Sequence, residues 1–237
     1  MVLSPSCSTG LFVTNEELAA LVHGYSKARL EVYLRLSGTD LDQAWLLLEW
    51  EQRLAAALWT DVARCELIVR NAIHTALQRI AQHADWYDRV DRLGIRGKDR
   101  SRIDEAHDRI VQQGKPVTVD RIVAHLSFTF WANLTSASYD RTLWSRGLDQ
   151  TFQLERRKAV HDAMTRVKDL RNAVAHHSPL VQDLRNETSQ DRLTKDLRAL
   201  HDLVRWTNPM LAARMHPSKA GQLLVQRPRP KIADGHT

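Results

Sequence analysis

The segment from Arg171 to His177 brings together side chains that suit acid–base and phosphate chemistry. It reads Arg-Asn-Ala-Val-Ala-His-His. A guanidinium can neutralise charge that develops on phosphate oxygens, and an imidazole can exchange a proton near neutral pH. The segment is therefore a candidate acid–base and oxyanion-stabilising cluster, in which Asn172 and His177 are available as hydrogen-bond donors beside Arg171 and His176.

An arginine followed five residues later by a histidine is a weak signal, because it occurs three times in this sequence: Arg102/His107, Arg156/His161 and Arg171/His176. Arg102 and Arg156 lie in runs of charged residues, and we expect both to point at water. At about 100° per residue, Arg171 instead projects from the middle of an apolar helix face. That face is formed by Val160, Ala163, Met164, Val167, Leu170 and Val174.

The position of Arg171 leaves two interpretations open. A guanidinium in a helix interface needs an ionic or multiply hydrogen-bonded partner, because burial without one is costly. The first interpretation is a structural ion pair. The second is a preorganised cation for a phosphate group.

His176 also has two interpretations. In an unbroken helix, residues five apart point ~140° apart, so His176 would not converge with Arg171. Because Pro179 disfavours helical geometry at Ser178, we expect the helix to unwind near His176 and turn its ring back. The alternative is that His176 interacts with the last carbonyl groups of the helix.

Glu66 and Arg70 lie at the border of another apolar stripe, one helical turn apart. Glu66 could hold Arg171 in place, as a positioning residue and not a catalytic one. The alternative is that both residues lie on a solvated helix edge.

Apolar residues repeat at helical spacing along most of the chain. The predicted helical segments are one from Asn15 onward, one from Thr39 or Asp40 to about Gln82, one from about Asp99 to Gln113, one from Thr118 or Asp120 through Trp131, one from about Thr151 to Ala175 and one across Leu193–Val204. Asp85–Gly97 is predicted to be a connector. No long window alternates with period two, so the predicted fold class is all-α, with one very long helix.

Composition is consistent with a globular protein of 237 residues, since 43% are hydrophobic and 26% charged. We expect an N-terminal extension over 1–14, one helical domain over 15–216 and a flexible basic tail over 217–237. Most of the seven tryptophans should be core residues. The net charge of +6 favours a polyanionic partner without proving one.

Several common signals are missing from the sequence. Met1–Thr14 lacks the features of a signal peptide, and no apolar run approaches the ~20 residues of a membrane span, so we expect no membrane and a cytoplasmic location. Cys7 and Cys65 have no metal-binding spacing. There is no Gly-rich phosphate loop and no clustered set of metal ligands, so we expect neither a metal nor a cofactor.

Three stretches of the sequence together resemble a known family of helical proteins. The first, Glu66…Val69-Arg70-Asn71-Ala72-Ile73, is similar to the family's Glu-x-x-Leu-Arg-Asn-Ala-Ile helix. The second is Leu126-Ser127-Phe128-Thr129-Phe130-Trp131 with Tyr139 and Leu143-Trp144. The third is Leu170-Arg171-Asn172…Ala175-His176-His177-Ser178-Pro179. Jointly these stretches resemble the Abi-like (abortive infection) family of the HEPN superfamily. Their order and separation agree with that family over roughly residues 25–209.

The resemblance implies a HEPN-like helical bundle with an Arg-x4-His ribonuclease site, typically assembled at a dimer interface. Carried over by position, Arg171 and His176 are the catalytic pair. Asn172, His177, Glu66, Arg70 and Asn71 are the supporting residues. Thr129 replaces a glycine of the family pattern, and Ser178 replaces an acidic residue, which removes a partner for His177. Some HEPN motifs continue to a tyrosine that a partner nucleotidyltransferase can modify. The second residue after His176 is Ser178, so this sequence has no tyrosine acceptor there.

On this basis we expect an RNA-cleaving toxin or phage-defence effector that acts without metal on an RNA substrate, as a homodimer. An antitoxin or other regulatory partner is left open. The rival hypothesis is a non-catalytic HEPN-like module that binds RNA or protein. A general helical DNA-binding protein is a weaker alternative, because no compact helix-turn-helix signature is present.

Overall fold

One helix of 41 residues, α3 (Leu41–Ala81), runs through the whole molecule and organises it. In the computed structural model, residues 15–181, 188–216 and 218–228 are described. The Asp40 side chain starts α3 by accepting a hydrogen bond of 3.0 Å from the Gln43 N–H. Gln82 ends it in the left-handed conformation, with φ 53°. Both ends agree with the sequence prediction.

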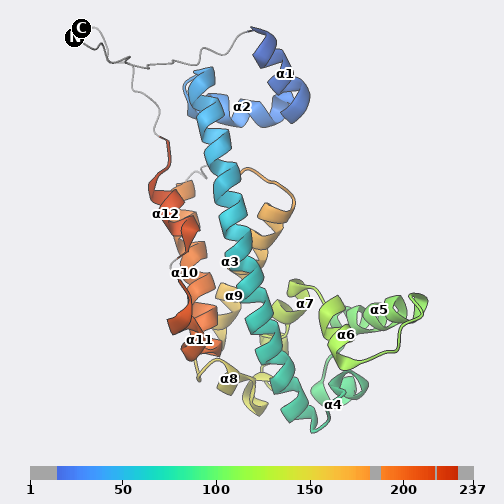
Figure 1. The fold of residues 1–237 in the computed structure, drawn as a ribbon. Helices are drawn as coiled ribbons and strands as arrows, with labels where there is room; N and C mark the ends of the chain where they lie inside the picture. The colour runs from blue at the N-terminus through green and yellow to red at the C-terminus, as the bar shows by residue number, and fades with distance from the viewer. Residues whose placement is uncertain (1–14, 182–187, 217, 229–237) are drawn as a thin grey trace, which may run out of the picture.

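The other helices surround α3 in three groups (Figure 1). Near its N-terminal end lie α1 (Asn15–Tyr25) and α2 (Lys27–Leu36). Alongside it run α9 (Arg157–Ala175), α10 (Ser189–Thr207), α11 (Pro209–Arg214) and α12 (Lys219–Val225). Its C-terminal half is flanked by α4 (Val90–Leu93), α5 (Lys98–Gln112), α6 (Val119–His125), α7 (Phe128–Asn133) and α8 (Leu148–Thr151). Short 3-10 turns occupy Trp86–Arg89, Ala137–Tyr139 and Trp144–Arg146.

The predicted all-α class is confirmed, since the described ranges contain helices and no strand. The core runs along the buried side of α3 and includes five tryptophans: Trp50, Trp86, Trp131, Trp144 and Trp206. None of the helices in these ranges is both long and apolar enough to cross a bilayer.

Two predicted helices are interrupted. The prediction of one helix from Thr118 through Trp131 is wrong, because Leu126 and Ser127 are extended and separate α6 from α7. In a continuous helix, residues 126 and 128 would point about 200° apart, whereas here both side chains are buried. The break lets both enter the core.

The prediction that a helix begins near Thr151 and continues to Ala175 is also wrong. Phe152 is fully buried and stacks on Trp144, with ring centroids 5.8 Å apart. Gln153 and Leu154 follow with φ of 53° and 61°, and these left-handed residues reverse the chain. The helix α9 therefore starts only at Arg157.

The predicted flexible tail is wrong for residues 219–225, which form α12. Ala220 and Leu224 are buried in the core. The indole N–H of Trp50 on α3 donates a hydrogen bond of 2.8 Å to the Leu223 carbonyl. This helix therefore belongs to the domain. The predicted extension over 1–14 and the end of the predicted tail, 229–237, lie outside the described residues.

A buried aromatic cluster joins the middle of the chain to α3. Trp86 is fully buried and packs against Phe130 and Trp131, with ring centroids 6.2 Å away in each case. Its indole N–H donates to Nδ1 of His74 at 2.9 Å. Nδ1 can accept this bond only when it carries no proton, so the contact selects the neutral imidazole.

Burial lowers the pKa of His74 below its ordinary value, and the charge of Asp120 opposes this shift less strongly. The folded state therefore takes up the His74 proton at lower pH than the unfolded chain does. The stability that depends on neutral His74 is complete above the pKa of the unfolded chain. It is lost as pH falls below that pKa, because only the unfolded chain then binds the proton readily. Between about pH 8 and about pH 5.5, we expect the wild-type melting temperature to fall more steeply than that of His74→Gln.

Scanning calorimetry across this pH range checks the prediction. The control is His107→Gln, the same exchange at an exposed histidine, which should keep the wild-type slope. Equal slopes for the wild type and His74→Gln would contradict it.

Candidate functional site

Arg171 belongs to α9, and its side chain lies against α3. It directly follows Leu170 in the sequence. The buried residues of α9 are Val160, Ala163, Met164, Val167, Leu170 and Val174. The Arg171 side chain is 33% exposed and its Nε lies 4.0 Å from Oε2 of Glu66 on α3. The structure thus brings Arg171 and Glu66 together across the helix interface.

The ion pair between Arg171 and Glu66 leaves the guanidinium short of hydrogen bonds. Its Nε is buried and has no hydrogen-bond partner among the described residues. Nη1 donates only a long bond of 3.5 Å to the Oδ1 of Asn172. A partly exposed pair at 4.0 Å contributes at most about 1 kcal/mol. A planar guanidinium offers five N–H groups, so Arg171 retains donors for the oxygen atoms of a ligand.

Arg70 adds a second cation beside Glu66. The two residues are four apart on α3 and so lie on the same side of that helix. Nε of Arg70 is also buried without a hydrogen-bond partner in the described ranges. Arg70 thus places a second guanidinium one helical turn from Glu66 on α3. Asn71 follows on the exposed surface of α3 and makes no described side-chain bond to Arg171.

The helix α9 ends at Ala175, as expected, but this end does not turn the His176 ring back toward Arg171. The N–H of His176 bonds the Asn172 carbonyl at 2.9 Å, so His176 keeps the helical register. His177 then adopts the left-handed conformation, with φ 52°. The N–H groups of His177 and Ser178 bond the carbonyls of Val174 and Ala173 at 3.1 and 2.8 Å. These bonds are the Schellman arrangement, which closes a helix without turning its last side chains back.

The structure therefore does not bring His176 to Arg171 within one chain. The helical register keeps their side chains ~140° apart. No described hydrogen bond or ion pair joins them, and the His176 ring is exposed. An active pair made of these two residues would need a second chain to supply one of them.

The other two Arg-x4-His pairs have different surroundings. Contrary to expectation, Arg102 does not point freely at water, because it bonds the buried carboxylate of Asp99. Asp99 also accepts hydrogen bonds from Tyr139 and Asn133, at 2.9 and 3.0 Å. Arg156 is exposed, as expected, while His161 contacts the Thr135 hydroxyl at 3.1 Å. Arg102 is therefore a structural residue with a strong partner, unlike Arg171.

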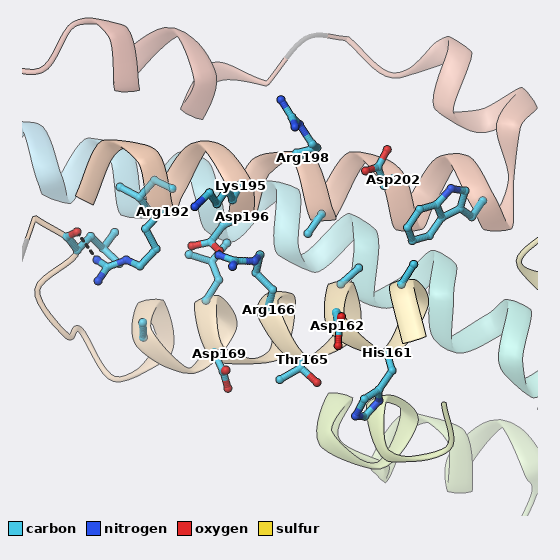
Figure 2. A pocket seen from close by; sticks show the side chains of 18 of the residues that line it. His161, Asp162, Thr165, Arg166, Asp169, Arg192, Lys195, Asp196, Arg198 and Asp202 are labelled. Carbon is cyan, nitrogen blue, oxygen red and sulfur yellow. Dashed lines mark hydrogen bonds and ion pairs between the residues drawn. The ribbon is translucent and has the colours of Figure 1, made fainter. Parts of the chain in front are cut away.

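A wide groove between α9 and α10, of about 930 Å³, does not contain the candidate residues. Figure 2 shows that Arg166 and Asp196 point toward one another there, and their ion pair measures 2.9 Å. Acidic and basic side chains alternate along the groove. We assign it no ligand, because its central cation is already bonded to a buried carboxylate of the chain itself.

Sequence reasoning missed Glu51, a carboxylate that is only 4% exposed. It accepts hydrogen bonds from the Tyr33 hydroxyl at 2.9 Å and from the Val181 N–H at 3.2 Å. Burial raises the pKa of its carboxyl group, and these two bonds oppose the shift. The signal was present, because Glu51 falls on the buried α3 stripe between Leu47 and Leu54.

Comparison with known proteins gives no relative of this chain. Neither a family model, nor a curated protein, nor a solved structure matches it. The assignment to the Abi-like family therefore stays a prediction from three stretches of sequence. Among the described residues, no group of three His, Cys, Asp or Glu side chains has the arrangement of a metal site.

The left-handed conformation of His177 generates a stability prediction. A side chain with a Cβ atom costs about 1–2 kcal/mol in this conformation, and glycine does not. We expect His177→Gly to be as stable as the wild type or up to about 1 kcal/mol more stable. His177→Val should lose about 1–2 kcal/mol, because a β-branched residue fits this conformation poorly.

Urea unfolding at equilibrium measures both variants, with Ser178→Ala as the neighbouring control. A stability loss in His177→Gly that equals the loss in His177→Val would show that the imidazole itself stabilises the helix end.

Proposed function

We propose that this protein is a metal-independent endoribonuclease of the HEPN type, acting as a toxin or phage-defence effector. The observation that carries the proposal is the incompletely bonded Arg171. It lies 4.0 Å from Glu66 at a helix interface, and two adjacent histidines follow it five and six residues later in the chain. Burying guanidinium donors without partners is costly, so their presence favours a ligand with several oxygen atoms, such as a phosphate.

In the proposed reaction, His176 accepts the proton of a ribose 2′-hydroxyl, and the 2′-oxygen attacks the adjacent phosphorus. The bond from phosphorus to the 5′-oxygen of the next nucleotide breaks. That oxygen takes a proton, and the products are a cyclic phosphate and a 5′-hydroxyl. Arg171 neutralises the charge that builds on the phosphate oxygens. Asn172 orients the substrate through hydrogen bonds, and His177 orients it or protonates the leaving oxygen.

A homodimer fits this proposal better than a single chain. Since Arg171 and His176 of one chain point in different directions, a two-fold arrangement would pair Arg171 of each chain with His176 of the other. Leu67, beside Glu66 on α3, is 48% exposed and offers an apolar contact for the second chain.

A second function is favoured by one specific observation. Because Arg171 and His176 do not meet within a chain, the same surface could bind RNA or a protein without cutting it. In that case Arg171 is a binding residue and His176 only ends a helix.

The catalytic proposal predicts that Arg171→Ala and His176→Ala each lose RNA cleavage by about 10²–10⁴-fold while staying folded. Arg171→Lys should also fail, because an ammonium cannot replace a planar bidentate fork. Cleavage should persist in EDTA, require the 2′-hydroxyl and leave a cyclic phosphate. Gel analysis of labelled RNA, accompanied by thermal melts, measures these outcomes.

The matched control is Arg156→Ala, which removes an exposed arginine from another pair with the same spacing and should leave the cleavage rate unchanged. A purified wild-type protein that binds RNA and never cuts it would replace the catalytic proposal with the binding module.

The dimer proposal predicts complementation between two inactive variants. Light scattering at micromolar concentration should report a dimer. When Arg171→Ala and His176→Ala chains exchange subunits at random, half of the dimers are mixed and each mixed dimer has one complete site. Cleavage should then return to about a quarter of the wild-type rate. Absence of any recovery, with exchange verified by mass spectrometry, would contradict a site shared between chains.

A further inference from the structure

A cavity of about 780 Å³ adjoins the candidate segment on the side of α1 and α2. His177 and Ser178 form part of its wall, so it opens next to the end of α9. The side chains on which its chemistry depends are Tyr25, Arg29, Glu51 and Trp59. Its size lies within the usual range for small-molecule pockets.

The floor of the cavity is a buried carboxylate. The Tyr33 hydroxyl and the Val181 N–H each bond one oxygen of Glu51 and fix its orientation. A carboxylate has about four acceptor positions, so these bonds leave capacity for further donors. Arg29, half-buried in the same wall, supplies N–H groups that can bond acceptor atoms.

The wall contains an unusually exposed aromatic ring. Trp59 is 44% exposed, whereas five of the other tryptophans are buried. Tyr25 lies in the wall too, and its hydroxyl accepts a hydrogen bond of 3.0 Å from Gln52. A flat indole surface in an open cavity is suited to stacking against a planar ring.

Among the four bases of RNA, guanine matches this set of groups. Its N1–H and N2 amino group are adjacent donors that a carboxylate can accept together, and O6 and N7 are acceptors for a guanidinium. Adenine and cytosine present an acceptor beside their amino group, and uracil flanks its single N–H with two oxygens. Each of these arrangements leaves a lone pair facing the lone pairs of Glu51.

The cavity and the Arg171–Glu66 pair lie along the same helices. Trp59 precedes Glu66 by seven residues on α3, roughly 10 Å. On α9, Ala175 lines the cavity and follows Arg171 by four residues, on the same side of the helix. A nucleotide whose base occupied the cavity could therefore extend its phosphate toward Arg171.

We infer that this cavity holds an unpaired guanine base of the RNA, next to the phosphate that Arg171 contacts. The inference rests on the proposed ribonuclease function for its choice of RNA, while the recognition of guanine depends only on the cavity. The site thereby gives the enzyme a preference for cleaving beside guanosine.

Binding of nucleoside monophosphates to the full-length protein tests the guanine assignment without relying on cleavage. In isothermal titration calorimetry, guanosine monophosphate should bind at least about tenfold more tightly than the adenosine, cytidine and uridine compounds. Inosine monophosphate, which lacks the N2 amino group, should bind more weakly than the guanosine compound. Equal binding of all the nucleotides, or of none, would overturn the inference.

The protein side of the test uses Trp59→Ala, an exposed position where folding should be retained. It should weaken binding of guanosine monophosphate by about tenfold or more, because a stacking aromatic is removed. The control is Leu46→Ala, which truncates a similarly exposed apolar residue of α3 outside the cavity. This variant should bind guanosine monophosphate with the wild-type affinity. An unchanged affinity in a folded Trp59→Ala protein would refute the stacking role.

Two further outcomes separate this inference from the proposed function. Cleavage that depends on Arg171 and shows no preference for guanosine would overturn the guanine site and leave the ribonuclease intact. Selective binding of guanosine monophosphate, competitive with a single-stranded RNA but without cleavage, would support the site and overturn the enzyme. If the mononucleotide binds and fails to displace RNA, the cavity serves a free nucleotide and the assignment to an RNA base is wrong.

Discussion

The apolar stripe of α3 is the constraint on which the rest of the molecule depends. A helix of 41 residues is roughly 60 Å long, and most of its stability must come from tertiary packing. Leu58, Val69 and Ile73 on this stripe have no exposed surface. Helices α2, α9, α10 and α12, together with α4, α7 and α8 along its C-terminal half, pack against α3 and cover this stripe (Figure 1). The same packing sets Arg171 of α9 opposite Glu66 of α3, so the candidate site follows directly from how the core is covered.

Buried charged groups of this fold differ in how completely they are hydrogen-bonded. Asp99 accepts bonds from Arg102, Tyr139 and Asn133, which offset the cost of its burial. Arg171 and Arg70 instead keep buried Nε atoms without such partners. Three other buried atoms in the described ranges also lack partners, namely Trp131 Nε1, Thr142 Oγ1 and Trp206 Nε1, but only the two arginines are charged groups. This physical contrast distinguishes Arg171 from the other arginines with a histidine five residues on.

The end of α9 imposes a second constraint on any chemistry. The Schellman arrangement satisfies the last carbonyl groups of the helix and keeps His176 in register, ~140° from Arg171. It also holds His177 in a left-handed conformation that glycine would adopt more easily. The histidine at this position also lines the cavity beside the segment.

The sequence by itself determined the features that depend on local spacing and capping. The 3.6-residue period predicted α3, a cap at Thr39 or Asp40 predicted where it begins, and the apolar face of α9 predicted that Arg171 would lie at a helix interface. Tertiary structure decided the features that depend on residues far apart in the chain. Leu126 and Phe128 break a helix because both are drawn into the core, and α12 packs on the core, where Trp50 bonds its backbone. Glu51 likewise accepts a hydrogen bond from the N–H of Val181, 130 residues away. A hydrogen bond across the fold leaves no periodic pattern in the sequence, so this partner could not be predicted.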